Sequence, residues 1–143
     1  MRATLRAGLH GALAYRVPPE RTVPHLLPES DDFREMPEVL ATGYLVGIVE
    51  WTCMRALAEH LDAGEQTVGV HVDLSHEAPT PPGATVHVSA TLTHLDGRRL
   101  CFAVEARDDA GVVCRGTHDR AVIDRKRFDR GLTGRASAAE ARS

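Results

Sequence analysis

The sequence predicts an α+β domain in which an antiparallel sheet wraps around one long central helix. Residues 37–61 are apolar on nearly every side when wound as a helix, so this segment must be covered by other parts of the chain. Four consecutive runs between residues 68 and 123 alternate with a period of two and are separated by tight turns, which is typical of an antiparallel sheet. A sheet that curls around the helix buries it most simply.

The composition favours one domain and excludes several classes of function. With 143 residues, of which 43% are hydrophobic, the chain is long enough for one core, which we assign to residues 1–128. Residues 129–143 show no apolar periodicity and are predicted to form a disordered tail. A net charge of −3 with only 4% aromatic residues argues against nucleic-acid binding, and no run reaches the ~20 apolar residues that span a membrane.

The three cysteines lie far apart in the sequence, and none of them forms a CxxC pair. This spacing argues against a disulfide framework and against a thiolate zinc site. HExxH and HxxxH spacings are also absent from the sequence. We therefore expect reduced cysteines, a cytoplasmic location and no bound metal.

The first strand is predicted from Leu5 to Val17, where weak alternation ends at two prolines. Ser30 then offers an N-cap for one acidic helical turn. Phe33 and Met36, three residues apart, share one side of that turn. Beside the central helix, this turn would either cover a pocket or simply connect two elements.

The central helix carries one carboxylate in an unusual position. Glu50 shares a helical stripe with apolar neighbours, so it is expected to point into packed material. It must then be paired with a cation, hydrogen-bonded, held neutral or open to a wet pocket. A structural ion pair and a catalytic role fit this position equally well. Thr42 is predicted to cap the helix that follows it, and Gly64 to terminate it.

The four later strands are predicted at residues 68–76, 85–93, 100–106 and 112–123. In the first of these strands, an apolar face that contains Val70 and Val72 continues to His76, and we expect this face to pack on the helix. The imidazole of His76 and the carboxylate of Glu50 would then meet at one rim of the core. A hydrogen-bonded core histidine without a catalytic role is the alternative.

One strand, one long helix and four strands, in that order, make the hot-dog arrangement. Its sheet leaves a long strand edge exposed in a single chain, and such an edge invites pairing with another chain. We therefore predict a homodimer with a continuous sheet.

The candidate site residues suggest acyl chemistry. His76 titrates near neutral pH, and a neighbouring Glu50 would orient it and favour its charged form. The hydroxyl of Thr42 lies near a helix N-terminus, where partial positive charge favours a developing oxyanion. Arginine pairs at 98–99 and the basic run 125–127 are ordinary solvated charge, or they hold the phosphates of a nucleotide-like carrier.

Four motifs resemble the fluoroacetyl-coenzyme A thioesterase family. They are PEVLATGYLVGIVEWTCMRA, SHEAPTPPG with its histidine, the hairpin GRRL and the closing GTHDRAVI. The resemblance covers about residues 17–123 in order and spacing. It implies hydrolysis of a short acyl thioester without a cofactor, because coenzyme A is part of the substrate.

The resemblance also implies roles for individual residues. Thr42, Glu50 and His76 match the catalytic threonine, glutamate and histidine of the family. Gly69 matches a glycine whose backbone N–H places the thioester carbonyl, and Arg120 matches an arginine near the active site.

The lid over the acyl pocket differs from the family pattern at one position. Phe33 matches one lid aromatic, but Met36 stands where the fluoroacetyl enzyme has a second phenylalanine, so the preferred acyl group can differ. Two other functions fit the same fold, namely a hydratase or dehydratase acting on a carrier-bound acyl chain and a non-catalytic acyl-CoA-binding module.

Overall fold

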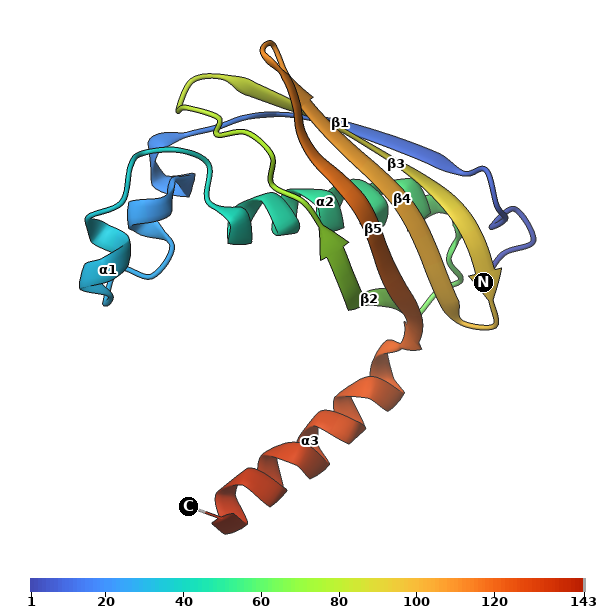
Figure 1. The fold of residues 1–143 in the computed structure, drawn as a ribbon. Helices are drawn as coiled ribbons and strands as arrows, with labels where there is room; N and C mark the ends of the chain where they lie inside the picture. Colours follow the sequence, from blue (N-terminus) through green and yellow to red (C-terminus); the bar gives the residue numbers. More distant parts are fainter. Residues whose placement is uncertain (143) are drawn as a thin grey trace.

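The structure, a computed structural model, describes residues 1–142 and shows a curled antiparallel sheet around one long helix (Figure 1). The strands are β1 His10–Arg16, β2 Glu65–Leu74, β3 Thr85–Asp96, β4 Arg99–Asp108 and β5 Gly111–Asp124, and the α-helices are α1 Asp31–Arg34, α2 Thr42–Leu57 and α3 Arg125–Arg142. The five strands lie in the order β1-β3-β4-β5-β2, with every neighbouring pair antiparallel. The predicted α+β architecture is confirmed.

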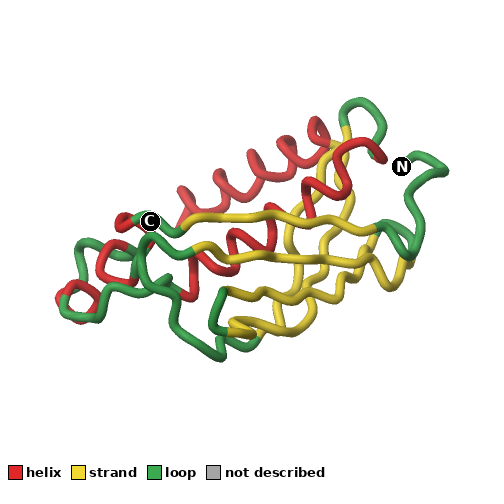
Figure 2. The backbone as a smooth tube through the Cα atoms, turned by 90° about the horizontal axis from the view of Figure 1, so that it is seen from above, coloured by secondary structure: helices red, strands yellow, loops and turns green. Residues whose placement is uncertain are grey.

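Helix α2 lies across one face of the sheet (Figure 2), and the core lies between the two. Leu45, Val49 and Leu57 of the helix are at most 1% exposed. Alternate side chains of β3 and β4 are buried against them, at Val86, Val88, Ala90, Leu92, Leu100, Phe102, Val104 and Ala106. Each fully buried aliphatic or aromatic side chain contributes about 1.5–3 kcal/mol, so this two-residue period is what fixes the sheet on the helix.

Helix α2 differs from the prediction at its start and on one face. Ala41 is its N-cap residue, with no side-chain capping hydrogen bond, so the prediction that Thr42 caps the helix is wrong. Gly64 has a positive φ of 84°, but α2 ends earlier, at Leu57, and a short 3-10 turn follows. The helix is also not covered all round, because Gly47, Trp51 and Met54 form part of an exposed stripe.

In the first half of strand β2 the residues that face the helix, Thr67 and Gly69, are the opposite of those predicted, whereas beyond a β-bulge Val72, opposite the buried His118, and Leu74 face inward as predicted. Val70 and Val72 are each 45% exposed, whereas Thr67 is buried. The register shifts between Gly69 and His71, where a β-bulge interrupts the pairing with β5. Such a bulge adds one residue and re-aims the side chains beyond it, which an unbroken period of two does not anticipate. Strand β2 is the last strand of the sheet on this side.

The two ends of the chain also differ from expectation. The first strand begins at His10, not Leu5, whose side chain is buried in an irregular segment. Residues 129–143 are predicted to be disordered, but as far as Arg142 they continue helix α3, which projects away from the sheet (Figure 1). Arginine and alanine favour helices, and Arg125 pairs with Asp129 one turn later at 3.0 Å. Ser143 lies outside the described residues.

All three cysteines are free thiols. Burial raises the pKa of Cys53 to about 12 and that of Cys114 to about 11. The pKa of the half-buried Cys101 is raised as well, first by burial and then by the neighbouring Asp119. Within residues 1–142, no helix combines the length and the apolar character needed to cross a bilayer.

Candidate active site

A threonine and a histidine meet at the N-terminal end of α2. Thr42 is the first residue of the helix, and His76 lies in the loop that follows β2. The two side chains are hydrogen-bonded, with 2.8 Å between Thr42 Oγ1 and His76 Nδ1. They border a hollow of about 300 Å³ that is lined by Val23, Val39, Leu40, Thr42, His76, Glu77, Ala78 and Pro79.

His76 is prepared for proton transfer. Burial lowers its pKa below the ordinary value of 6.5, and the backbone of Ala78 acts in the opposite direction with a smaller effect. The imidazole is therefore mainly neutral at pH 7. Its Nε2 atom is buried and has no hydrogen-bond partner among residues 1–142. A buried polar atom without a partner costs stability, so it often marks a functional group.

Glu50 and Arg120 form the centre of a second cluster. Arg120 NH1 donates to Glu50 Oε2 at 2.9 Å, and the Arg120 side chain is only 3% exposed. Its Nε and NH2 donate to the hydroxyl and the carbonyl oxygen of Thr67, at 2.8 and 2.9 Å. Glu50 is 38% exposed, so it is paired with a cation and also open to solvent. The prediction that it points into packed material therefore holds for the side that contacts Arg120 and fails for the side that is open to solvent.

Gly69 lies against this ion pair and leaves no room for a side chain. A Cβ atom at Gly69 would lie 2.8 Å from Glu50 Oε2 and 3.2 Å from His118 Cε1. Such close approaches would force the carboxylate to move. The backbone of β2 therefore borders Glu50 directly, and Gly69 is opposite Arg120 in the pairing of β2 with β5.

His118 belongs to the same cluster and was not singled out from the sequence. It is 1% exposed, its Nδ1 lies 2.8 Å from the carbonyl oxygen of His71, and its Nε2 lies 3.1 Å from Arg120 NH1. Because Nδ1 must donate to a carbonyl, Nε2 accepts from the arginine. Burial is the main cause that lowers the pKa of His118, which favours this neutral form. Its position two residues before Arg120 on one strand was the available signal.

The predicted residues fall into two groups within one chain. Thr42 and His76 form one group, while Glu50, Gly69 and Arg120 form the other. Thr42 and Glu50 are eight residues apart on α2, which is about 12 Å along a helix. No hydrogen bond or ion pair joins Glu50 to His76 among the described residues, so the predicted contact between them is absent from the single chain.

The two candidate lid residues lie outside both groups. Phe33 is in α1, where its backbone N–H donates to Ser30 Oγ at 3.3 Å, as the predicted cap requires. Met36 follows α1 and is 50% exposed. Helix α1 lies next to the turn Val23–His25, and Val23 borders the hollow beside His76. The lid segment is thus adjacent to the hollow.

Taken together, the two groups contain the side chains that a thioester hydrolysis needs. His76 can transfer a proton, Glu50 can orient or attack, and the bordering N–H and guanidinium groups can stabilise an oxyanion. Within residues 1–142, no three histidine, cysteine or acidic side chains are grouped so that they could hold a metal ion.

Comparison with known proteins identifies a family. Residues 20–126 match the family described as fluoroacetyl-CoA-specific thioesterase. The chain is 46% identical over 129 residues to a fluoroacetyl-CoA thioesterase of Streptantibioticus cattleyicolor, and the match covers 90% of this chain and 93% of that protein.

Solved structures of the same family and of more distant proteins share this fold. A mutant of the fluoroacetyl-CoA thioesterase FlK in complex with fluoroacetate matches with a TM-score of 0.89 and 44% identity, over 92% of this chain and 98% of that one. A hot-dog-like protein from Thermanaerovibrio acidaminovorans matches with a TM-score of 0.78 and 21% identity, over 92% and 93% of the two chains. The predicted hot-dog fold is confirmed.

Proposed function

Because this chain belongs to the fluoroacetyl-CoA-specific thioesterase family, we propose that it hydrolyses a short acyl-CoA to the free acid and coenzyme A. The observation that carries the proposal is the state of the His76 imidazole. It is hydrogen-bonded to Thr42 through Nδ1, its lowered pKa keeps it mainly neutral, and its buried Nε2 has no hydrogen-bond partner among residues 1–142. Fluoroacetyl or a similarly small group is the proposed acyl part.

In the proposed reaction, an oxygen nucleophile attacks the thioester carbonyl carbon and the carbon–sulfur bond breaks. His76 takes the proton from the attacking water and returns it to the leaving thiolate. Glu50 orients this water, or attacks first and is then released by water, with the same products. Thr42 and the Gly69 N–H position the carbonyl oxygen. We assign Phe33 and Met36 to the acyl pocket, because their segment adjoins the hollow at Val23.

The proposed chemistry uses only side chains and water, so we propose that no metal or organic cofactor takes part. We also propose a cytoplasmic location, which the three free cysteines support.

We further propose a homodimer with a continuous sheet. Val70 and Val72 are exposed on the edge strand β2, and α2 leaves Gly47, Trp51 and Met54 exposed on its outer side, where the Trp51 ring packs edge-on against Tyr15 of β1. Nothing lies within 4 Å of a Cβ placed at Gly47, so a second helix can approach closely there. Two antiparallel β2 strands would cover both surfaces with one symmetric contact.

This dimer also addresses the separation of the two groups of site residues. A twofold axis that pairs the β2 strands makes the two α2 helices antiparallel. Gly47 lies between positions 42 and 50, so helices that cross near it bring Thr42 of one protomer toward Glu50 of the partner subunit. Each active site would then use His76 and Thr42 from one chain and Glu50 from the other.

A heterodimer of two inactive variants tests the shared site. We expect Glu50→Gln and His76→Ala homodimers to be inactive, and a heterodimer purified with two affinity tags to recover about half of the wild-type activity, because one of its two sites contains only wild-type residues. Sedimentation would confirm that two chains are present. A heterodimer as inactive as both parents would place each site within one chain.

Release of free thiol from a panel of acyl-CoAs tests the proposed function. We expect turnover of acetyl-CoA and fluoroacetyl-CoA, with weaker activity on long and aromatic acyl groups, and the same rates after dialysis against EDTA. A hydratase would change the acyl chain of an enoyl-CoA and leave the thioester intact. A binding module would bind acyl-CoA in calorimetry and release no thiol. Either of the last two results would reject the thioesterase.

A further inference from the structure

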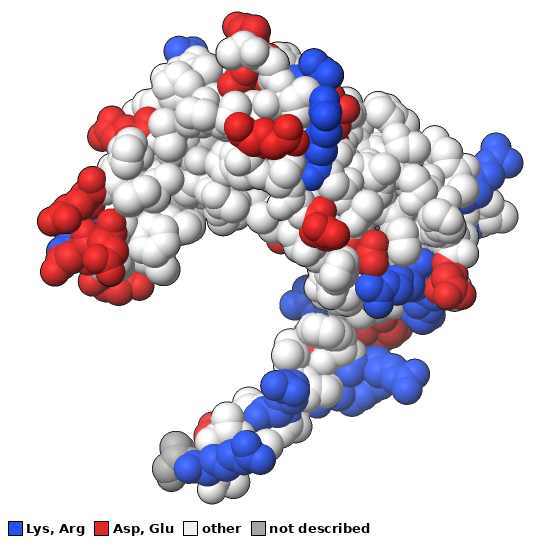
Figure 3. All heavy atoms as spheres, in the orientation of Figure 1, with Lys and Arg blue, Asp and Glu red and all other residues white. Residues whose placement is uncertain are grey.

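Charge is unevenly distributed along this chain. Helix α3 carries six cationic and two acidic side chains, a net charge of +4, whereas the whole chain carries −3. Residues 1–124 therefore carry −7. Figure 3 shows the cations along the projecting helix and a dense acidic group at the opposite, α1 end of the molecule. A strongly anionic ligand is attracted to α3 and repelled by most of the remaining surface.

A hollow of about 350 Å³ lies where β5 continues into α3. It is lined by Arg98, Val122, Ile123, Asp124, Arg127 and Phe128. An aromatic ring beside aliphatic side chains offers a flat apolar surface for a nucleotide base. Two guanidinium groups at its border suit phosphate oxygens. The hollow thus combines the two features that a phosphorylated nucleoside requires.

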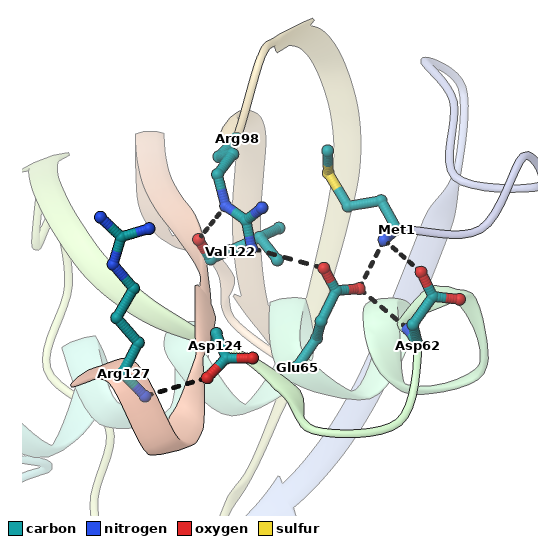
Figure 4. Close-up of polar contacts among 7 residues, drawn as sticks. All are labelled: Met1, Asp62, Glu65, Arg98, Val122, Asp124 and Arg127. Atoms are coloured by element: carbon teal, nitrogen blue, oxygen red, sulfur yellow. Dashed lines mark hydrogen bonds and ion pairs between the residues drawn. The ribbon is translucent and has the colours of Figure 1, made fainter. Parts of the chain in front are cut away.

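Of the two cations at this hollow, Arg98 is partly engaged and Arg127 is available to a ligand. Arg98 uses Nε to hold the carbonyl oxygen of Val122 at 2.9 Å, while its NH2 lies 3.4 Å from Glu65, and its side chain is 55% exposed (Figure 4). The Arg127 guanidinium has no hydrogen bond or ion pair with any of residues 1–142. In Figure 4 it extends away from Asp124, which instead accepts from the Arg127 backbone N–H at 2.9 Å.

We propose that this hollow binds the phosphorylated adenosine end of coenzyme A, an inference that rests on the thioesterase function proposed above. Arg127 and Arg98 contact the phosphates, and Phe128 packs against the base. Residues 127 and 128 follow directly after the segment 20–126 that matches the family model.

The distance between the hollow and the candidate site fits the length of coenzyme A. Arg120, which holds Glu50, comes four residues before Asp124 on β5, a span of about 13 Å along a strand. The pantetheine arm contains about as many consecutive bonds as four residues of backbone, so it reaches about as far when extended. A thioester at Glu50 can therefore have its nucleotide end at α3.

Substrates with and without the nucleotide test the proposal. We compare kcat/KM for an acyl-CoA with kcat/KM for the same acyl-pantetheine, and expect the ratio to fall about 5–10-fold in Arg127→Ala, since a charged hydrogen bond at an exposed site is lost. Phe128→Ala should lower the same ratio. Arg142→Ala, a charge-matched control at the far end of α3, should keep the wild-type ratio. 3′-Dephospho-CoA thioesters identify the phosphate involved.

Binding of coenzyme A by calorimetry separates this proposal from the function on which it rests. Weaker binding in Arg127→Ala, with Arg142→Ala unchanged, supports the nucleotide site even if the wild type releases no thiol from any acyl-CoA. A thioesterase whose ratio and coenzyme A affinity are the same in wild type, Arg127→Ala and Phe128→Ala would keep its function and overturn the site. Equal losses in Arg127→Ala and Arg142→Ala would also overturn it, since they would show only a general charge effect.

Discussion

Replacing His76 with alanine is expected to lower kcat/KM for a short acyl-CoA by about 10²–10⁴-fold, the usual contribution of a positioned acid–base group. The residue lies in a loop, and its side chain is hydrogen-bonded to the exposed Thr42, so the thermal unfolding temperature should change by no more than a few degrees. Steady-state kinetics and a thermal melt on one preparation measure both effects. His87→Ala, on the exposed side of β3, is the matched control.

The pH profile adds a second measure of the same residue. The lowered pKa of His76 keeps the imidazole neutral above pH 6.5. If neutral His76 is the base, wild-type kcat/KM is at its plateau at neutral pH and falls as the pH drops through that lowered pKa. In His76→Ala, kcat/KM should be low at every pH and should no longer fall further as the pH drops through this range. A variant that turns over normally, or that keeps the same fall at low pH, would remove His76 from the mechanism.

Replacing Arg120 with methionine is expected to lower the free energy of unfolding by about 3 kcal/mol. The guanidinium is almost fully buried and donates to Thr67, Glu50 and His118, which tie β5 to β2 and to α2. Methionine fills a similar volume but leaves the carbonyl oxygen of Thr67 without this donor. Urea unfolding measured at neutral pH gives the difference directly.

The control for this change is Arg99→Met. Arg99 pairs with Asp119 at 2.8 Å on the same sheet, but its side chain is 50% exposed, so its loss should cost less than about 1 kcal/mol. Activity should fall in the Arg120 variant and stay unchanged in the control, because only Arg120 holds Glu50. Equal losses of stability in the two variants would show that the buried network does not hold these three elements together.

The alternation of apolar and polar residues predicted the fold because the apolar set of each alternating strand forms the core. The alternate positions of β3 and β4 that the sequence marks as apolar are those that are buried, and the turn at Gly97 has the positive φ of 58° that favours glycine. The apolar run 37–61 identified the central helix, although the stripe with Gly47, Trp51 and Met54 is exposed within one chain. We propose that a second chain covers this exposed stripe, and the apolar pattern of a single chain does not show which surfaces a second chain will cover.

The site was less predictable because its contacts depend on local irregularities. The bulge after Gly69 changes which side of β2 faces the helix, and no residue type announces it. Thr42 resembles a cap in sequence, but its hydroxyl contacts His76 from a loop 34 residues later. His118 was overlooked because a histidine inside an alternating strand gives no sign that an arginine two residues later will use it as an acceptor. The roles of these residues in catalysis remain predictions.

The high pKa values of the thiols have a consequence for an enzyme whose product is itself a thiol. Thiol–disulfide exchange requires a thiolate, and Cys53 and Cys114 are almost entirely protonated at neutral pH as well as buried. Oxidised coenzyme A should therefore not accumulate on these two residues as a mixed disulfide. Colorimetric reagents that report released thiol should likewise record little background from the folded protein, with Cys101 as its main source.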